Sequence, residues 1–302
     1  MIDTADLWEF YQKDRPRLMP RLLSIMKREN LNCFYKIKQV NTMTLKQMTK
    51  FWDDHINGWL NGNDGLPDSL DQWFRSYSGK GAGEVKPEGM PEPWIGNLSD
   101  PACARVVLLG LNPGNYIKHL QNRVDGIYAE EIRKLGSYTK WASANPYLRD
   151  PWTGKKDYGI NGYHKNRLAF ARHWLGEPNL PESAVVLMEL YPWHSKSIKG
   201  EMNPAPKTIR RFVLDPIDEL TNVKDIFAFG KPWKKIIHEL LRTDPKMFGK
   251  DKNEEDYGSN VKSRKVQVYS LPSGKRIIVE WHSGSAGPPS EKEADLLKKA
   301  LG

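Results

Sequence analysis

The sequence predicts an α/β protein: a three-layer α/β/α domain with a central four-stranded, mostly parallel sheet, plus an N-terminal helical region. Four short runs of β-branched, aliphatic or aromatic residues, each bounded by Gly, Pro or charged residues, are typical of buried strands. Segments with apolar residues at helical spacing lie between these runs. Strands that alternate with helices favour a parallel sheet covered by helices on both faces.

The first part of the chain favours helices. Apolar residues recur at helical spacing, most clearly over Met48–Leu60. Thr44 is followed three residues later by a glutamine, a pair typical of the capping box at a helix start. The Gly- and Pro-rich segment 76–97 then indicates a loop or linker. We therefore expect a helical N-terminal region at residues 1–85 and an α/β domain at residues 86–302.

Four strands and four main helices are expected in the α/β domain. The predicted strands are Arg105–Gly110, Ala184–Leu190, Val223–Phe229 and Arg276–Glu280. The predicted helices cover residues 165–175, 209–220, 232–241 and 291–301. Ligands of such sheets bind just beyond the carboxyl ends of the strands, so the residues that follow each strand are the candidates for chemistry.

The composition of the 302 residues is that of a folded protein. Hydrophobic residues make up 39%, and 11 Trp, 12 Tyr and 9 Phe supply more aromatic surface than a disordered chain carries. No apolar run approaches the ~18 residues that cross a bilayer, and the first residues do not resemble a signal peptide. Only Cys33 and Cys103 are present, which excludes a disulfide framework and an iron–sulfur or zinc site built on clustered thiolates. We expect a cytoplasmic monomer without metal or cofactor.

The charge of the chain favours a polyanionic partner. Forty-six Lys and Arg residues against 37 Asp and Glu residues give a net charge of +9 at pH 7. Such an excess makes a polyanion the first partner to consider, although many basic proteins bind no nucleic acid.

Polar or small residues follow each predicted strand. The first strand leads into Gly110-Leu-Asn-Pro-Gly, which has neither the GKS/T of a phosphate-binding loop nor the G-x-G-x-x-G of a dinucleotide fold. The other three strands lead into turns that contain serines, lysines or histidines, and such groups bind phosphates. Each turn alone is equally compatible with ordinary turn chemistry.

Five motifs, four of them in or next to these turns and one before the first strand, together resemble the uracil-DNA glycosylase superfamily. They are PWIGN at 93–97, GLNPG at 110–114, ELYPWHS at 189–195, FAFGK at 227–231 and EWHSGSAG at 280–287. The resemblance covers residues 90–302. GLNPG is similar to the Asn-containing first motif of the mismatch-specific and single-strand-selective branches, without assigning a branch. WHSGSAG is similar to the second motif, usually His-Pro-Ser-Pro, with both prolines replaced.

The resemblance implies a monofunctional DNA glycosylase, an enzyme that flips a nucleotide into a pocket and hydrolyses its N-glycosidic bond. It assigns Asn112 to holding a water below the sugar, and His282 to donating a hydrogen bond to O2 of the departing base. The motif supplies no lysine nucleophile, so we expect an abasic site as product without strand cleavage.

Two departures from the family motifs bear on the base that is removed. Glu189 stands where uracil-removing relatives carry an Asn, and an ionised Glu can only accept hydrogen bonds, which suits the N4 amine of cytosine. A one-residue misalignment, or a lysine partner for Glu189, is the alternative. Gly114 stands where stringent relatives carry a bulky Tyr, which leaves room at C5 of the base. The expected substrate is a C5-modified cytosine, including a glycosylated one as in phage DNA, and the expected role is antiviral defence.

Two other functions stay open at this point. One is repair of uracil or thymine in mismatches, and the other is a non-catalytic DNA-binding module. Tyr116 and Tyr128 are the candidates for stacking on the base, with core packing of the tyrosine as the alternative. The candidate DNA-binding residues are Ser195, Lys196, Gly230, Lys231, Ser283, Gly284 and Ser285.

Overall fold

The computed structural model describes residues 42–153, 161–249, 265–280 and 288–302. The chain divides into two compact units, Met1–Thr42 and Met43–Gly302. The helices predicted before residue 42 lie outside the described residues. Residues 43–85, which the sequence assigns to a helical N-terminal region, belong to the second unit together with the sheet.

Two helices form the first part of the second unit. Helix α2 (Leu45–Leu60) begins with the predicted capping box, because the Thr44 hydroxyl accepts a hydrogen bond from the backbone of Gln47 and the Gln47 side chain accepts one from the backbone of Thr44. Helix α3 (Asp68–Phe74) carries Trp73, whose indole N–H donates to the carbonyl oxygen of Leu190 at 2.9 Å. This bond fixes α3 next to the chain that leaves the sheet.

The sheet has seven strands in the order β1-β3-β2-β4-β7-β6-β5. The strands are β1 (Trp94–Ile95), β2 (Val106–Gly110), β3 (Val185–Glu189), β4 (Asp225–Phe229), β5 (Lys246–Gly249), β6 (Lys265–Ser270) and β7 (Arg276–Glu280). The pairs β3–β2, β2–β4 and β4–β7 are parallel, whereas β1, β6 and β5 add antiparallel edges. The predicted α/β class is confirmed.

The predicted number of four strands was wrong. Strand β1 has only two residues and β5 only four, too short for a periodic pattern to stand out. Strand β6, with the sequence KVQVYS, has polar residues at three of its six positions, so it lacks the continuous apolar run of the central strands.

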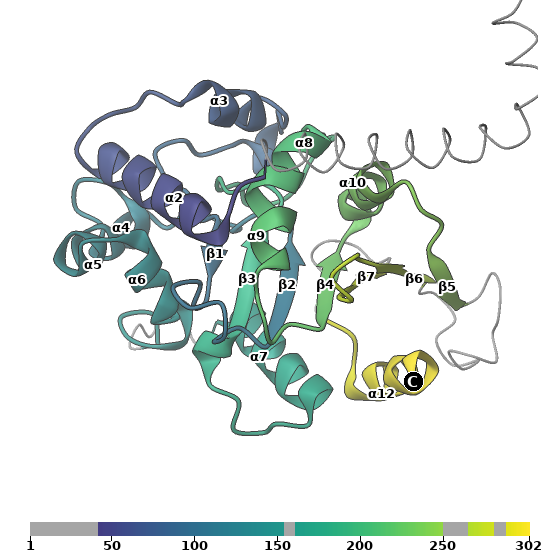
Figure 1. Cartoon of the computed structure of the whole chain (residues 1–302). Coiled ribbons are helices and arrows are strands. Elements are labelled where there is room, and N and C mark those ends of the chain that lie inside the picture. The colour runs from purple at the N-terminus through teal and green to yellow at the C-terminus, as the bar shows by residue number, and fades with distance from the viewer. Residues whose placement is uncertain (1–41, 154–160, 250–264, 281–287) are drawn as a thin grey trace, which may run out of the picture. The chain divides into compact units, whose positions relative to one another are not determined.

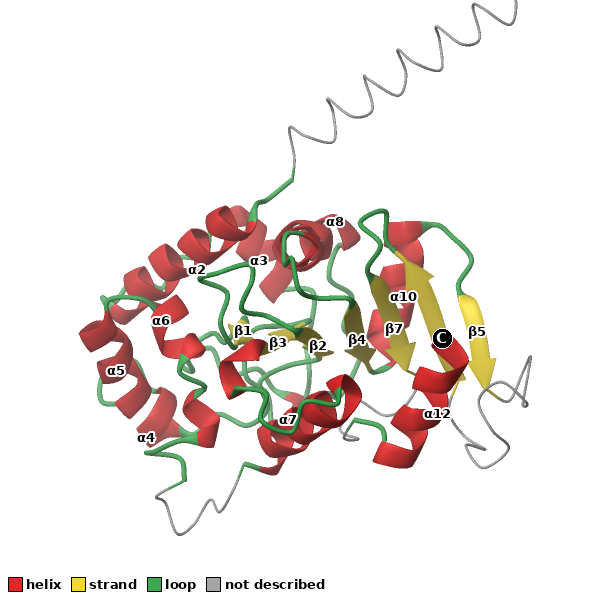
Figure 2. Ribbon diagram, turned by 60° about the horizontal axis from the view of Figure 1, so that its bottom comes forward, coloured by secondary structure: helices red, strands yellow, loops and turns green. Residues whose placement is uncertain are grey.

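Helices lie on both sides of the central strands. They are α4 (Lys118–Gln121), α5 (Ile127–Leu135), α6 (Tyr138–Ser143), α7 (Gly162–Leu175), α8 (Pro206–Ile209), α9 (Asp215–Asp218), α10 (Lys231–Leu241) and α12 (Glu291–Leu301). Figure 1 shows their order, and in Figure 2 α7 lies on one side of β2, β3 and β4 while α8 lies on the other. No described helix is long and apolar enough to cross a membrane.

Strands β2 and β3 end side by side and carry the site. Gly110 pairs with Glu189 in the parallel register, and the carbonyl oxygen of Gly110 accepts hydrogen bonds from the backbone of Leu190 at 3.1 Å and from the indole of Trp233 at 2.8 Å. The loop after β2 therefore starts from a backbone position that is fixed from two sides.

Candidate active site

A cleft of about 1090 Å³ lies beyond the carboxyl ends of β2 and β3. Four segments supply most of its lining: the loop Leu111–Asn115, the start of α7, the segment 196–203, and the start of α10. The other lining residues are Ile117, Gln121, Tyr147 and Trp152. Residues at the ends of different strands thus converge on one cleft, as the topology of parallel sheets requires.

A second, much tighter cavity adjoins this cleft and shares Pro113, Tyr163 and His164 with it. Its volume is about 10 Å³, room for about one water molecule. The remaining lining residues are Glu92, Trp94, Ile95, Leu187 and Glu189. We refer to it as the inner pocket and to the larger cavity as the outer cleft.

Asn112 lines the outer cleft, and Ser195 anchors its amide group. The Nδ2 atom donates to the carbonyl oxygen of Ser195 at 2.8 Å and to its hydroxyl oxygen at 3.0 Å. Because a carbonyl oxygen can only accept, this contact fixes which end of the amide is the nitrogen. The oxygen of Asn112 is then the atom left to accept a hydrogen bond from a water, as the predicted role requires.

Glu189 lies in the inner pocket with its side chain almost fully buried. The Tyr163 hydroxyl donates to Oε1 at 3.3 Å, and Oε2 has no hydrogen-bond partner among the described residues. Burial raises the pKa of Glu189 to about 8, against the lowering effect of the Arg167 guanidinium. The carboxyl group is therefore mostly neutral at pH 7 and not ionised as the sequence led us to expect, and a neutral carboxyl donates a hydrogen bond as well as accepting one.

Two more polar atoms of the inner pocket are buried without partners in the described part of the chain: the indole Nε1 of Trp94 and Nδ1 of His164. Burial lowers the pKa of His164 to about 3, so its imidazole is neutral at physiological pH. Buried polar groups without partners are rare in proteins. Three of them in one small cavity indicate that a polar ligand completes the site.

A buried network supports this pocket from behind. The carboxylate of Glu92 accepts hydrogen bonds from the Tyr147 hydroxyl at 2.6 Å and from the Gln121 amide at 2.7 Å. His194 lies between Glu92, whose Oε1 is 3.3 Å from Nε2, and the carbonyl oxygen of Gly114, 3.3 Å from Nδ1. The network thus connects the segment before β1 to the loop after β2 and holds that loop in place.

Gly114 faces open space, as the sequence predicts. Its φ is 86°, a left-handed conformation that favours glycine, and a Cβ atom added there would meet no atom of the described residues within 4 Å. The outer cleft therefore has room beside the Asn112 loop.

The predicted DNA-binding residues divide into two groups. Lys196 and Lys231 line the outer cleft and are exposed. Ser195 is fully buried and holds Asn112, and Gly230 is buried where a Cβ atom would lie 3.0 Å from the Leu111 side chain. Ser195 is therefore too buried to contact a phosphate, and the backbone at Gly230 passes close to Leu111.

The predicted stacking tyrosines do not line either cavity. Tyr128 is fully buried and packs against Trp141 and Tyr147, with ring centroids 5.0 and 5.7 Å away, so core packing explains it. Tyr116 is half-buried, and its hydroxyl accepts a hydrogen bond from Asn122 at 3.1 Å. The aromatic residue that does line both cavities is Tyr163, which the sequence analysis missed.

Other residues of the site were also missed. Tyr163 and Arg167 stand four residues apart on α7, and the guanidinium lies 3.2 Å from the centroid of the tyrosine ring. The helix was predicted to begin at residue 165, which left Tyr163 and His164 outside the pattern. The four-residue spacing of Tyr163 and Arg167 on one helix was the sequence signal that could have identified them. Lys199 and Lys235 also line the outer cleft.

The second predicted catalytic residue, His282, lies outside the described residues, as do Ser283, Gly284 and Ser285. Strand β7 ends at Glu280, which pairs with Phe229 at the end of β4. The chain therefore enters this segment from the same edge of the sheet that carries Glu189.

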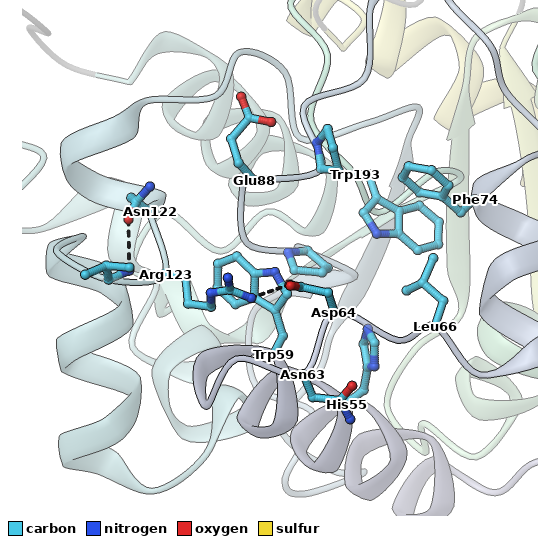
Figure 3. Close-up of a pocket in the computed structure, with 13 residues that line it drawn as sticks. His55, Trp59, Asn63, Asp64, Leu66, Phe74, Glu88, Asn122, Arg123 and Trp193 are labelled. Atoms are coloured by element: carbon cyan, nitrogen blue, oxygen red, sulfur yellow. Dashed lines mark hydrogen bonds and ion pairs between the residues drawn. The ribbon is translucent and has the colours of Figure 1, made fainter.

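Another cavity, of about 430 Å³, lies between α2 and the segment around residue 123. Figure 3 shows Trp59, Asp64 and Arg123 in it, and the last two form an ion pair. None of the predicted site residues that the structure describes lines this cavity. The candidate chemistry therefore belongs to the outer cleft and the inner pocket.

Compared with protein-family models and with curated proteins, the chain shows no match. Its resemblance to the uracil-DNA glycosylase superfamily accordingly rests on the five motifs and stays a prediction.

Proposed function

We propose that the protein is a monofunctional DNA glycosylase that hydrolyses the N-glycosidic bond of a flipped pyrimidine and leaves an abasic site. The observation that carries the proposal is the anchored amide of Asn112 in a cleft that adjoins a small buried pocket with unpartnered polar atoms. The proposal takes β3, β2, β4 and β7 as the central sheet of a three-layer glycosylase domain.

In this proposal the two cavities have different tasks. The outer cleft receives the sugar–phosphate backbone, whose charge suits the lysines at positions 196, 199, 231 and 235. The inner pocket takes the polar edge of the flipped base, and its small volume requires the lining residues to move apart slightly as the base enters.

Asn112 performs the hydrolytic step by positioning. Glycosidic bonds of this kind break with oxocarbenium character at the sugar, so the attacking water needs orientation more than a strong base. An amide oxygen with its nitrogen fixed by Ser195 provides this orientation. His282 is proposed to donate to O2 of the base as negative charge develops.

The proposed substrate is a C5-modified cytosine, including a glycosylated one, and the proposed role is defence against phages that carry such DNA. The open space at Gly114 and the volume of the outer cleft support a substituent at C5. Removal of unmodified cytosine would destroy the host genome. An enzyme that recognises cytosine must therefore act only on bases that carry a substituent at C5. The proposal includes a monomer that acts in the cytoplasm.

Repair of uracil or thymine in mismatches is the second candidate, and the neutral state of Glu189 supports it as well as it supports cytosine. A neutral carboxyl can accept from N3–H and donate to O4 of uracil, just as it can pair with the N3 and N4 atoms of cytosine. The hydrogen bonds of Glu189 alone therefore do not distinguish uracil from cytosine.

The proposal is tested with matched duplexes that contain cytosine, 5-methylcytosine, 5-hydroxymethylcytosine, its glucosylated form, or uracil opposite guanine. Alkali-labile sites and mass spectrometry of the released base report excision. We expect release of a C5-substituted cytosine, and loss of most turnover with retained DNA binding in Asn112→Ala. A mobility shift without any released base would identify a DNA-binding module instead.

A further inference from the structure

We propose that Glu189 is the general acid of this reaction and passes its carboxyl proton to N3 of the flipped cytosine as the C1′–N1 bond breaks. This inference rests on the proposed glycosylase function and adds to it the step that makes cytosine a leaving group.

Cytosine needs such an acid more than uracil does. When uracil departs, its negative charge spreads over two carbonyl oxygens, so hydrogen bonds from the protein stabilise it. Cytosine carries an amine in place of the second carbonyl, and its anion is a poorer leaving group. A proton delivered to N3 lets cytosine depart as a neutral molecule, which is the benefit that general acids provide.

The geometry of Glu189 suits this task. Its carboxyl group stands at the end of β3, in the inner pocket where we place the polar edge of the base. One oxygen, Oε1, is held by the Tyr163 hydroxyl, and the other, Oε2, is buried with no partner among the described residues. A buried carboxyl oxygen without a partner is costly unless a ligand completes it.

The base atoms match the two oxygens of a neutral carboxyl group. The N4 amine of cytosine donates and its N3 accepts, so one oxygen of Glu189 accepts from N4 while the other donates its proton to N3. Both contacts lie on the same side of the ring. The pair is therefore already aligned for transfer of the proton along an existing hydrogen bond.

The surroundings keep the proton on Glu189 until the base arrives. The titratable and charged groups around the carboxyl are Glu92 before β1, Tyr138 on α6, and Tyr163, His164 and Arg167 on α7. Loss of hydration raises the pKa of Glu189 most, Arg167 lowers it, and the negative charge of Glu92 raises it. With a pKa of about 8, the Glu189 carboxyl group is protonated at neutral pH and can donate its proton.

Each proton and electron pair of this step has a defined destination. The electron pair of the C1′–N1 bond moves to N1, the carboxyl proton of Glu189 moves to N3, and cytosine leaves as a neutral tautomer. Glu189 becomes a carboxylate that accepts from N3–H and N4–H. The water held by Asn112 adds its oxygen to C1′ and releases a proton to solvent, from which Glu189 is later reprotonated.

The test is Glu189→Gln, measured in single turnovers on the modified-cytosine duplex and on the uracil duplex. Glutamine keeps one donor and one acceptor but has no proton to give. We expect cytosine excision to fall ~100-fold or more, whereas uracil excision, which needs hydrogen bonds from this residue but no proton, should fall far less. Wild-type cytosine excision should also decline as the pH rises through about 8, and the residual activity of Glu189→Gln should lack that decline.

A second variant protects the test against misfolding. Glu189→Asp keeps a carboxyl group on a shorter side chain and should retain cytosine excision that declines with rising pH. Cytosine excision that is unaffected by Glu189→Gln, an equal loss on both duplexes, or Asn112-dependent release of uracil alone would overturn the general-acid role and leave the glycosylase function standing. Absence of any released base from the wild type would instead overturn the glycosylase function itself.

Discussion

Gly110 on β2 and Glu189 on β3 occupy paired positions in the sheet, and a Cβ atom at position 110 would lie 2.8 Å from Oε1 of Glu189 and closer still to Oε2. The same atom would lie 2.6 Å from the Tyr163 hydroxyl. Glycine is therefore required here for close approach rather than for an unusual backbone conformation. Because Gly110 has no side chain, there is space beside β2 for the Glu189 carboxyl group.

A methyl group at position 110 should disable the site while the fold persists. In Gly110→Ala the carboxyl of Glu189 and the hydroxyl of Tyr163 must move, at a cost of ~1–3 kcal/mol in stability for overpacking. We expect excision to fall at least ~100-fold because a misplaced group of the site loses its alignment. The matched control is Gly162→Ala on α7, where an added Cβ meets no atom within 4 Å in the part of the chain that the structure describes. Equal activity of the two variants would contradict the proposed place of Glu189.

Ser195 should matter for turnover although it is too buried to contact DNA. Ser195→Ala removes the hydroxyl that accepts from Asn112 at 3.0 Å but leaves the carbonyl oxygen that accepts at 2.8 Å. Loss of one such bond is worth ~1 kcal/mol, so we expect turnover to fall about five- to tenfold with unchanged DNA affinity. A loss of DNA affinity with normal turnover would instead support the original expectation of a phosphate contact.

The edge of the sheet explains which site residues could be predicted from the sequence. Asn112, Glu189 and Lys231 stand at or within two residues of the ends of buried strands, and the carboxyl ends of neighbouring parallel strands share one edge. Local sequence therefore fixes their place once the strands are recognised. The capping box at Thr44 is likewise a local signal, and the structure confirms it.

The remaining residues depend on how distant segments pack, which no local pattern encodes. Tyr163 and His164 reach the inner pocket because α7 starts beside β3. Glu92 reaches it because this residue lies just before β1, which pairs with β3. Tyr128 was misjudged for the same reason, since its burial follows from contacts with Trp141 and Tyr147. Sequence spacing favoured Tyr128 but did not distinguish a stacking tyrosine from one packed in the core.

A bulky side chain at position 114 should select against C5-substituted bases. In Gly114→Tyr the ring would occupy the open space beside the Asn112 loop, so we expect excision of the substituted cytosine to fall more than ~10-fold relative to a base with a bare C5. Because φ at this position is 86°, any side chain adds backbone strain. Gly114→Ala carries that strain without the bulk and is the control. If both variants lose the same activity on both bases, the space at C5 does not determine specificity.

The raised pKa of Glu189 also predicts how stability depends on pH. The folded protein holds the carboxyl proton up to about pH 8, whereas the unfolded chain releases it near its ordinary value of 4.5. Between these values the folded state binds more protons, so the contribution of Glu189 to stability is full below pH 4.5 and is lost as the pH rises through about 8.

Glu189→Gln removes this dependence because an amide does not titrate in that range. The free energy of unfolding of the variant, relative to the wild type, should therefore increase from pH 5 to pH 9 by a few kcal/mol. Urea denaturation of both proteins at pH 5, 7 and 9 measures the difference, in which the titration of all other groups largely cancels. A difference that is constant over this range would show that Glu189 is already ionised in the folded protein at pH 5. It could then carry no proton to the base at neutral pH.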